Sequence, residues 1–328
     1  MKILAVDDDP IILELLSHFV ESMTDHQLVT ASCAENALKV MQDHTRRPFD
    51  CFLLDIQMPG SDGIALAAQI RTMDSYFDAP ILMLTAMSEK QYFDSAFAAG
   101  ATDYITKPFE VNELQARIGL VERVVESNRG KTRKVFATKA LKAEPGKATP
   151  PIQLHEPVSI YEVDNVIEFR AMENYIQHLT RNDLFGSTVF AFTIRDIQNF
   201  HNAMTPFEFY SMLSDVSEVI SDTLGSHQFL MTYAGSGTFL CITESGWSPE
   251  PKMLENSINI ALSQIELFDN QGQMIEPRLC AGRAERLIWK SDASSVMHAV
   301  SIAHMSAEAA AQEYARIQQN FWQIGRLV

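Results

Sequence analysis

Short apolar runs alternate with amphipathic stretches over the first 128 residues, and this alternation limits the fold more than any other feature. Strands are predicted at five of the runs: residues 3–6, 28–31, 51–54, 81–84 and 104–106. Apolar residues recur at helical spacing in the intervening and following stretches: residues 10–23, 34–42, 64–72, 90–99 and 111–125. Strands that alternate with helices form parallel sheets. Residues 1–128 are therefore predicted to form an α/β domain with a five-stranded parallel sheet.

Polar side chains stand where four of these predicted strands end. They are Asp7, Asp8, Asp55, Thr85 and Lys107. In an open parallel sheet the loops at the carboxyl ends of the strands converge on one crevice, so these groups should share a pocket. Three carboxylates at close range would raise one another's pKa values unless a cation neutralised them. An all-oxygen site beside a phosphate suits Mg²⁺.

Asp55 is the predicted nucleophile, because an apolar strand ends on it and a turn follows at once. A carboxylate oxygen that attacks a phosphoryl group needs a cation and hydrogen-bond donors to absorb the charge on the transferring oxygens. The metal, the Lys107 ammonium and the Thr85 hydroxyl can supply these. The expected metal ligands are Asp8 and Asp55 directly, the main-chain carbonyl of Gln57, and Asp7 through water. Asp55 would then form an acyl phosphate.

The motifs that carry this chemistry resemble those of response-regulator receiver domains over about residues 1–125. They are Asp7-Asp8, Asp55 with Met58-Pro59-Gly60 and Asp62-Gly63, Thr85-Ala86, and Lys107-Pro108-Phe109, each at the family's spacing. The resemblance implies a flavodoxin-like fold. It also implies a phosphoryl donor that is a sensor histidine kinase or a histidine phosphotransfer protein.

The same resemblance implies a cis peptide bond before Pro108 and a switch at the phosphorylation site. In this switch Thr85 and the adjoining Ala86 respond to the phosphate, and an aromatic side chain on the next strand moves inward. Tyr104 occupies that position, although an ordinary half-exposed strand aromatic is the alternative. The readout surface would comprise residues 90–99, 104–106 and 111–125, and we expect a homodimer to respond through it.

Length and charge predict a second domain. Single domains usually run about 100 to 200 residues, and this chain has 328. Residues 1–128 carry 9 basic and 20 acidic side chains, residues 129–147 carry 7 and 1, and the remainder carries 10 and 21. We predict a receiver domain at residues 1–128, a basic, Pro-containing linker at 129–157, and an output domain at 158–328.

The charge distribution also limits the partners. Both acidic domains repel phosphate backbones at long range, so nucleic-acid binding is not expected of either. The basic linker leaves DNA binding open as an alternative, although we interpret it as a solvated segment attracted to the acidic domains. The apolar runs are shorter than the roughly 18 residues that a membrane span needs. Four scattered cysteines without CxxC spacing favour a reduced, cytoplasmic protein.

The output domain is predicted to be an α+β, ferredoxin-like fold, because its elements follow a β-α-β-β-α-β order. Helices are expected at residues 162–180, with Ser159 and Glu162 as a capping box, after Thr205-Pro206-Phe207-Glu208, and at 252–267 and 293–312. Strands are expected at residues 188–194, 229–233, 238–243 and 278–284. The turn Gly235-Ser236-Gly237 is interpreted as a hairpin turn rather than a phosphate loop.

The segment from Asp196 to Phe200 resembles the first metal-ligand loop of class III nucleotide cyclases and, less closely, of diguanylate cyclases. The resemblance spans about residues 187–312. An Asp at a strand end is also common as a turn or helix-capping residue. A cyclase uses two metals to activate the attacking hydroxyl and neutralise the leaving pyrophosphate. Two carboxylates on adjacent strands normally hold them in that family.

The second acid is absent. Ser236 stands in its place, or Gly237-Thr238 in the diguanylate cyclase alignment, and a neutral hydroxyl does not replace a carboxylate on a divalent metal. Ser301 and Met305 stand where class III cyclases place an Asn and an Arg that stabilise the transition state. We therefore expect a catalytically inactive, cyclase-like domain that binds a downstream protein or a nucleotide. A working cyclase controlled by the receiver is the alternative.

Overall fold

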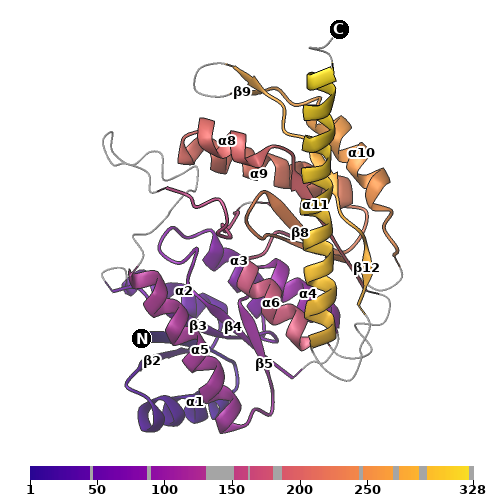
Figure 1. Ribbon diagram of the computed structural model, residues 1–328. Helices are drawn as coiled ribbons and strands as arrows, with labels where there is room; N and C mark the ends of the chain where they lie inside the picture. Colours follow the sequence, from indigo (N-terminus) through magenta and orange to yellow (C-terminus); the bar gives the residue numbers. More distant parts are fainter. Residues whose placement is uncertain are drawn as a thin grey trace. The chain divides into compact units, whose positions relative to one another are not determined.

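The computed structural model describes residues 1–44, 47–86, 90–130, 151–161, 163–179, 187–243, 247–268, 273–287 and 294–324 (Figure 1). The chain divides into two compact units, residues 1–133 and 134–328. Among the described residues, no helix combines the length and apolar character needed to cross a membrane.

The first unit is built on a five-stranded sheet whose order is β2-β1-β3-β4-β5, with every pair parallel. The strands are β1 (Lys2–Val6), β2 (Gln27–Ala31), β3 (Cys51–Asp55), β4 (Ile81–Thr85) and β5 (Asp103–Thr106). Every residue of β1, β3 and β4 is buried, as expected where helices cover both faces of a parallel sheet. The predicted α/β fold with five parallel strands is confirmed.

Helices follow each strand of the first unit. They are α1 (Pro10–Met23), α2 (Ala34–Asp43), α3 (Gly63–Arg71), α4 (Lys90–Ala98) and α5 (Val111–Gly130). Local signals set the start of α1, since Asp9 accepts a hydrogen bond from the Ile11 amide and Pro10 occupies the first turn. Side chains from α1 and α5 pack on one face of the sheet. Helix α5 continues past the predicted end at residue 125, because neither glycine nor proline stands between residue 125 and Gly130.

The second unit contains an antiparallel sheet whose order is β11-β6-β8-β7. Its strands are β6 (Thr188–Ile194), β7 (Phe229–Tyr233), β8 (Thr238–Thr243) and β11 (Leu279–Ala281), and β12 (Glu285–Arg286) also pairs with β6. Its helices are α6 (Phe169–His178), α8 (Ile197–Ala203), α9 (Pro206–Leu224), α10 (Pro251–Leu262) and α11 (Ser294–Ile324). The predicted capping box at the start of α9 is present, with Thr205 and Glu208 as its partners.

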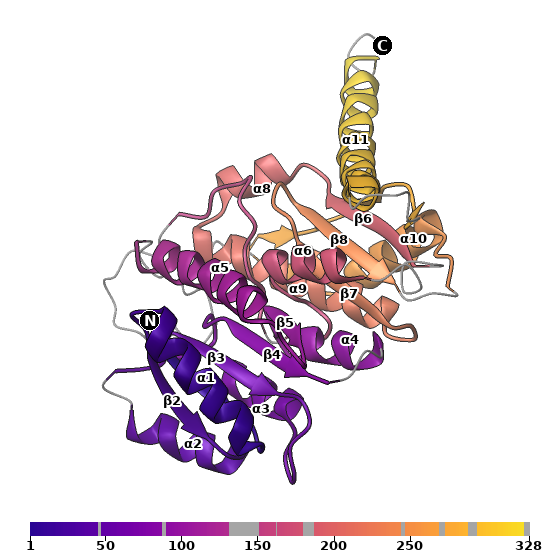
Figure 2. The same cartoon turned by 90° about the horizontal axis from the view of Figure 1, so that it is seen from below.

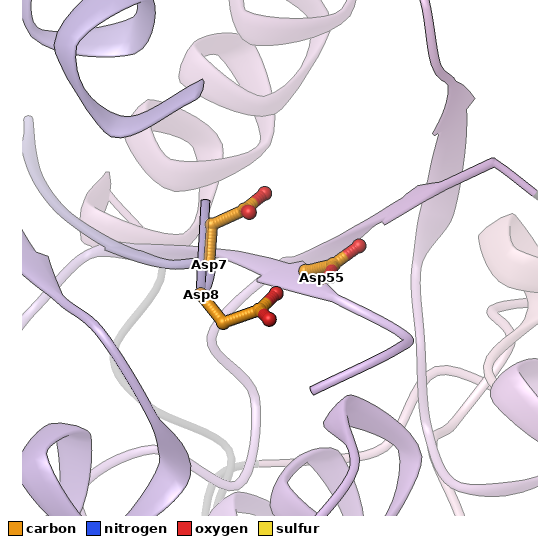
Figure 3. Close-up of side chains that lie close together, drawn as sticks. All are labelled: Asp7, Asp8 and Asp55. Atoms are coloured by element: carbon orange, nitrogen blue, oxygen red, sulfur yellow. The ribbon is translucent and has the colours of Figure 1, made fainter. Parts of the chain in front are cut away.

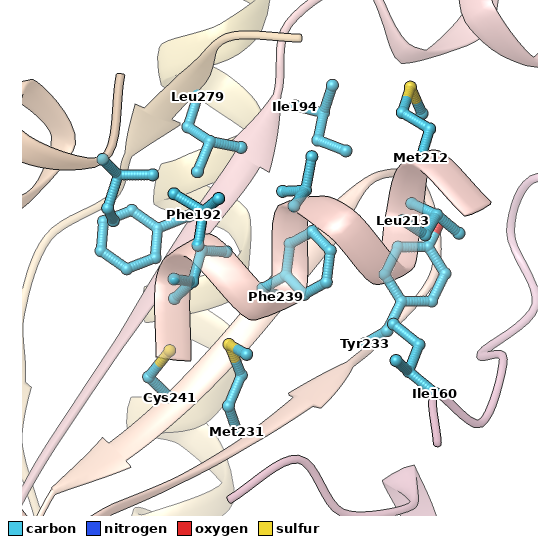
Figure 4. Close-up of a cluster of buried hydrophobic side chains, with 14 of the residues drawn as sticks. Ile160, Phe192, Ile194, Met212, Leu213, Met231, Tyr233, Phe239, Cys241 and Leu279 are labelled. Atoms are coloured by element: carbon cyan, nitrogen blue, oxygen red, sulfur yellow. The ribbon is translucent and has the colours of Figure 1, made fainter. Parts of the chain in front are cut away.

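The core of this unit lies between the sheet and α9 and α10 (Figure 4). Phe192 and Phe239 from the two central strands meet Leu213 of α9 there. Successive strand residues point to opposite faces, so the alternate residue Ala191 lies on the other face. Helix α11 packs against β6 and β11 with a row of buried alanines, at positions 299, 303, 307 and 311. Its C-terminal end projects past the sheet (Figures 1 and 2).

Tertiary contacts alter several predicted elements of the second unit. The predicted helix at 162–180 begins only at Phe169, because the preceding residues run along the edge strand β7: Asn165 is left-handed (φ 61°), and the Ile167 amide donates to Met231. The Ser159 hydroxyl bonds Glu168 at 3.4 Å, and Glu162 lies outside the described residues. Because α6 begins at Phe169 with Glu168 as its N-cap, Ser159 is not the N-cap of this helix.

Three further boundaries differ from prediction. Helix α10 ends at Leu262 rather than residue 267, and Leu267–Phe268 forms β9, which pairs with β10 (Met274–Ile275). The predicted strand at 278–284 shortens to β11, which ends before Gly282, where a Cβ would lie 2.5 Å from the Ser306 hydroxyl on α11. The separate strand β12 follows beyond the predicted end. Helix α11 runs on past the predicted end at residue 312.

The second core also begins earlier in the chain than predicted. Residues 129–157 were assigned to the linker, yet Ile152 and Leu154 are buried in this core, with 4% and 8% of their surface exposed. Residues 153–156 form a turn, in which the Glu156 amide donates to the Gln153 carbonyl at 3.2 Å, so these two apolar side chains enter the core without helix or strand periodicity. The basic part of the predicted linker, residues 131–150, lies outside the described residues.

Replacing Gly63 with Ala should destabilise the first unit. A Cβ at this position would lie 2.0 Å from the Asp55 carbonyl oxygen, so the backbone must move, and overpacking of this kind costs about 1–3 kcal/mol. Gly119→Ala is the matched control, because a Cβ there meets no described atom within 4 Å and Ala is favoured over Gly in a helix by about 0.5–1 kcal/mol. In urea unfolding, the control should have the larger free energy of unfolding. Hydrogen exchange of the β3 amides should be slower in the control than in Gly63→Ala. Equal stabilities would contradict the close approach.

Candidate functional site

Three carboxylates gather at one edge of the parallel sheet, where β1 and β3 end (Figure 3). Asp7 and Asp8 follow β1, and Asp55 is the last residue of β3. One carboxylate oxygen from each lies within 4.8 Å of the others. Asp7 is fully buried and Asp55 is 5% exposed, whereas Asp8 is open to solvent. The cluster therefore has two carboxylates inside the protein and one at its mouth.

Lys107 neutralises the two buried carboxylates. Its ammonium Nζ lies 2.6 Å from Asp7 Oδ2 and 2.8 Å from Asp55 Oδ1. The other oxygen of Asp7 accepts a hydrogen bond from the Asp9 amide at 3.0 Å. Side chains from three segments of the sheet edge are thereby fixed in one hydrogen-bonded group. Within the part of the chain that the structure describes, the other oxygen of Asp55 accepts no hydrogen bond from the protein.

The electrostatics follow from burial and from these contacts. Burial raises the pKa of the Asp55 carboxyl group, and the neighbouring Asp7 and Asp8 charges add to the rise; the hydrogen bond from Lys107 opposes it without cancelling it. For Lys107, burial acts to lower the pKa. The hydrogen bonds to Asp55 and Asp7 outweigh that effect, so the pKa of the ammonium lies above its ordinary value. The contacts with Asp55 and Asp7 therefore favour the charged form of Lys107.

The turn after Asp55 is held closely against the strand end. The Gly63 amide donates to the Ile56 carbonyl at 3.0 Å, and Asp62 caps α3 by accepting from the Ala65 amide at 2.7 Å. The backbone of Gly63 approaches that of Asp55 so closely that a side chain would not fit. Gln57, whose carbonyl is a predicted metal ligand, lies exposed in this turn.

The remaining predicted switch residues lie on the neighbouring strands. Thr85 is buried at the end of β4, its carbonyl accepts from the Lys107 amide at 2.6 Å, and Ala86 beyond it is exposed. The peptide bond between Lys107 and Pro108 is cis, which confirms that expectation. Tyr104 is 8% exposed, and its ring stacks on Phe93 of α4 with centroids 4.2 Å apart. It is thus a buried aromatic rather than a half-exposed one.

Comparison with known proteins agrees with this geometry. A family model described as "Response regulator receiver domain" matches residues 3–119. This part of the chain is a response regulator receiver domain.

Individual relatives match over a similar length of chain. The chain is 39% identical over 128 residues to the transcriptional regulatory protein KdpE of Staphylococcus aureus, covering 39% of this chain and 52% of that protein. It is 41% identical over 124 residues to the alkaline phosphatase synthesis transcriptional regulatory protein PhoP of Bacillus subtilis, covering 37% and 48%. The chain thus spans about half the length of these curated relatives.

A solved structure, the chemotaxis protein CheY4 of Vibrio cholerae, is 31% identical to this chain. The alignment covers 37% of this chain and 97% of that structure, with a TM-score of 0.35.

In the second unit, the segments that carry two of the four predicted site residues, Asp196 and Ser236, contact each other. Asp196 is exposed and left-handed (φ 54°) just after β6, and Ser236 lies in the β7–β8 turn. These segments touch, since the Ile194 amide donates to the Gly237 carbonyl at 2.9 Å and the Ile197 side chain packs on Gly237. Ser301 and Met305 are exposed on α11, away from its buried alanine row.

Two features of the second unit were missed at the sequence level. Arg195, directly after β6, pairs with the buried Glu255 of α10 at 3.2 Å, and its guanidinium lies 3.8 Å from the ring centroid of Tyr314. His155 contacts Ser236, with 2.8 Å between Nδ1 and Oγ. In the sequence, Lys252 and Glu255 show only the three-residue spacing of an ordinary helix ion pair, which does not point to Arg195. His155 stands in a Pro-rich stretch that carries no periodic signal.

Lys107→Ala should lower the free energy of unfolding of the receiver domain by about 3 kcal/mol in metal-free buffer, because it leaves two buried carboxylates uncompensated. It should also bind Mg²⁺ more tightly than the wild type, since the ammonium no longer competes for these oxygens. Lys39→Ala, at an exposed position of α2, is the matched control and should change neither property. Urea unfolding and calorimetric titration with MgCl₂ measure both. A variant as stable as Lys39→Ala, with unchanged Mg²⁺ affinity, would contradict the role of Lys107.

Proposed function

We propose that the receiver domain accepts a phosphoryl group on Asp55 from a sensor histidine kinase or a histidine phosphotransfer protein. The observation that carries the proposal is the bridge from Lys107 to Asp7 and Asp55, which fixes one oxygen of Asp55 and places a cation beside it. The phosphorylated state then alters the interactions of the second unit. The match to the receiver family over residues 3–119 supports the first step.

The donor set fits a magnesium ion. Asp7, Asp8 and Asp55 offer carboxylate oxygens close enough to share one cation, and Mg²⁺ takes oxygen ligands while keeping several waters. We propose that Asp8, Asp55 and the Gln57 carbonyl would hold the ion, with Asp7 acting through water. When bound, the ion would neutralise negative charge on the transferring phosphoryl oxygens.

The transfer itself uses residues of this chain for position and charge. An oxygen of Asp55 forms a bond to phosphorus as the phosphorus–nitrogen bond of the donor histidine breaks. The electron pair stays on the imidazole nitrogen. The Lys107 ammonium can then donate a hydrogen bond to a phosphoryl oxygen in place of Asp55. The Thr85 hydroxyl at the end of β4 can donate a second hydrogen bond to the phosphoryl group. The product is an acyl phosphate on Asp55.

The new charge supplies the signal. A phosphoryl group adds about two negative charges and three acceptor oxygens. We propose that Thr85 and Ala86 respond to it and that the change reaches Tyr104, which lies on the adjacent strand packed against α4. The face formed by α4, β5 and α5 would then change its contacts. A homodimer formed through this face is part of the proposal.

For the second unit we propose a catalytically silent, cyclase-like recognition module. Support comes from the strand order β11-β6-β8-β7 in a β-α-β-β-α-β chain, and from the contact between the Asp196 loop and the hairpin turn. The turn offers the neutral Ser236 where a second carboxylate would be needed for two metals. Ser301 and Met305 cannot stabilise a pentacoordinate phosphate as an Asn and an Arg would. Its ligand would be a downstream protein or a nucleotide.

Asp55→Asn should abolish phosphorylation. Full-length protein incubated with acetyl phosphate and MgCl₂ should gain the mass of one phosphoryl group, because the Asp55 carboxylate attacks phosphorus as the phosphorus–oxygen bond to the acetyl group breaks and acetate leaves. Asp43→Asn, on the surface helix α2, is the control and should gain it like the wild type. Intact-mass spectrometry measures the gain. Phosphorylation of Asp55→Asn to the wild-type extent would remove the basis of the proposal.

Purified protein should form no cyclic nucleotide from ATP or GTP and no cyclic dinucleotide from GTP, with either Mg²⁺ or Mn²⁺. Losing one charged group from a transition-state site typically costs several kcal/mol, or about a hundredfold or more in rate. Chromatography of the products, before and after treatment with acetyl phosphate, is the measurement. Appreciable product in either state would show a working cyclase instead.

A further inference from the structure

The two short strands β9 and β10 form a ribbon outside the main sheet of the second unit. Ile275 packs against the core of the unit, and Leu267 pairs with it across the ribbon. Successive strand residues point to opposite faces, so Phe268 and Met274, which pair with each other, face away from that core. Their side chains are 56% and 51% exposed. The outer face of the ribbon is therefore an exposed apolar pair.

The exposed apolar surface continues from the ribbon to the end of α10. Ile265, three residues before Phe268, is exposed, and its amide donates to the Leu262 carbonyl at the end of the helix at 3.4 Å. Ile260, on the last turn of α10, is exposed as well. Single exposed apolar residues are common on proteins, whereas a group of them with a polar rim marks a binding surface. We call the side chains of Ile260, Ile265, Phe268 and Met274 the ribbon patch.

The spacing within the ribbon patch fits an α-helix. Directly opposed side chains on an antiparallel ribbon have Cβ atoms about 4.5–5.5 Å apart, and side chains three or four residues apart on a helix have Cβ atoms about 5–6 Å apart. A helix with apolar residues at i, i+4 and i+7 can therefore set successive side chains against Met274, Phe268 and Ile265. An amphipathic helix that lays its apolar face on an apolar surface is a recurring mode of recognition.

The charge around the ribbon patch favours a basic partner. Residues 260–276 include three acidic residues and no basic one. Glu266 and Glu276 are exposed there, and Arg278 pairs with Glu276 at 3.3 Å. Residues 148–328 carry 10 basic and 21 acidic side chains, so the whole unit attracts a cationic partner at long range.

A second copy of this chain fits the ribbon patch less well. Two-fold contact of the patch with itself would bring the Glu266 side chains of both copies toward each other, and each copy carries a net charge of -16. Like charges placed together at an interface oppose association. Charge and spacing together therefore favour a helix from another protein.

We propose that the ribbon patch binds a basic amphipathic helix of a partner protein. The apolar face of this helix covers Phe268 and Met274, and its Lys and Arg side chains meet Glu266 and the acidic surface beyond. This inference deepens the recognition role proposed for the second unit and rests on it. It identifies the ligand as a protein, and it involves neither the Asp196 loop nor the Gly235–Gly237 turn.

Titration of the full-length protein with a model helix tests the proposal. The probe is a fluorescent peptide of about 18 residues, made of Leu and Lys in a pattern that places every Leu on one helix face. Fluorescence anisotropy gives its dissociation constant. Phe268→Ser and Met274→Ser should each weaken binding about tenfold, because each removes an apolar anchor. Ile260→Ser, outside the two strands, should also weaken binding and leaves the ribbon intact. Met297→Ser, at an exposed position of α11, is the matched control and should leave binding unchanged.

The charge of the partner has a test of its own. A peptide with Glu in place of every Lys should bind at least about tenfold more weakly, because its charge has the same sign as that of the unit. Glu266→Gln should weaken binding of the Lys peptide, and added salt should weaken it in the wild type. Glu218→Gln, at an exposed position of α9, removes the same charge from a different helix and is the control.

Three results would overturn the inference. Equal affinity of the wild type and all three patch variants, with unchanged urea unfolding curves, would place the peptide elsewhere. A Glu peptide that binds as tightly as the Lys peptide would exclude a basic partner. A dimer in light scattering that Phe268→Ser dissociates would make a second copy the occupant.

The assay for cyclic products fails separately from this one. Product formation would contradict the catalytically silent module, whereas the peptide titration would still report whether the ribbon patch binds a basic helix. Loss of binding in the patch variants without any cyclic product supports both proposals.

Discussion

The ion pair that links Lys107 to Asp7 and Asp55 is the interaction on which the site depends. Two carboxylates buried this deeply would repel each other and favour protonation unless a cation stood between them. Such a pair contributes little net stability, because desolvation offsets most of the attraction. The ion pair instead fixes the positions of these side chains, because it connects the ends of β1 and β3 to the loop after β5. The edge of the sheet is thereby arranged before any phosphoryl group arrives.

Much of the receiver domain could be predicted, because local and global signals agree there. Four of the five strands have a polar site residue at or directly after their ends, and a parallel sheet brings those ends together. The gathering of Asp7, Asp8, Asp55 and Lys107 follows from strand order alone. The burial of Tyr104 did not, because it depends on Phe93 of α4, which no pattern near Tyr104 reveals.

In the second unit, three predicted strands are correct, whereas several predicted helix boundaries and one predicted strand differ from the structure. Strands 188–194, 229–233 and 238–243 are correct to the residue, since alternation and the glycine turn bound them. The start of α6 was wrong because residues near Asn165 pair with β7 instead. The division of β11 from β12 reflects the close packing of α11 on Gly282, a contact between segments distant in sequence. Tertiary packing decided each of these cases.

Residues 152–156 also show where prediction from sequence patterns fails, because a segment without periodicity is structured there. Prolines and missing periodicity in residues 129–157 favour a linker, and two isolated apolar residues do not change that interpretation. Only the structure shows that Ile152 and Leu154 enter a core and that their carbonyls meet His201 and Ser236. The C-terminal end of the predicted linker therefore belongs to the second unit.

We propose that the carboxylate of Asp55, and no other in the acidic cluster, carries the phosphoryl group. Acyl phosphates are reduced by borohydride, so phosphorylated protein treated with tritiated borohydride should yield one labelled homoserine. Peptide sequencing then locates it. We expect the label at position 55, at the end of β3. A label at position 7 or 8, or no label after treatment with acetyl phosphate and Mg²⁺, would contradict it.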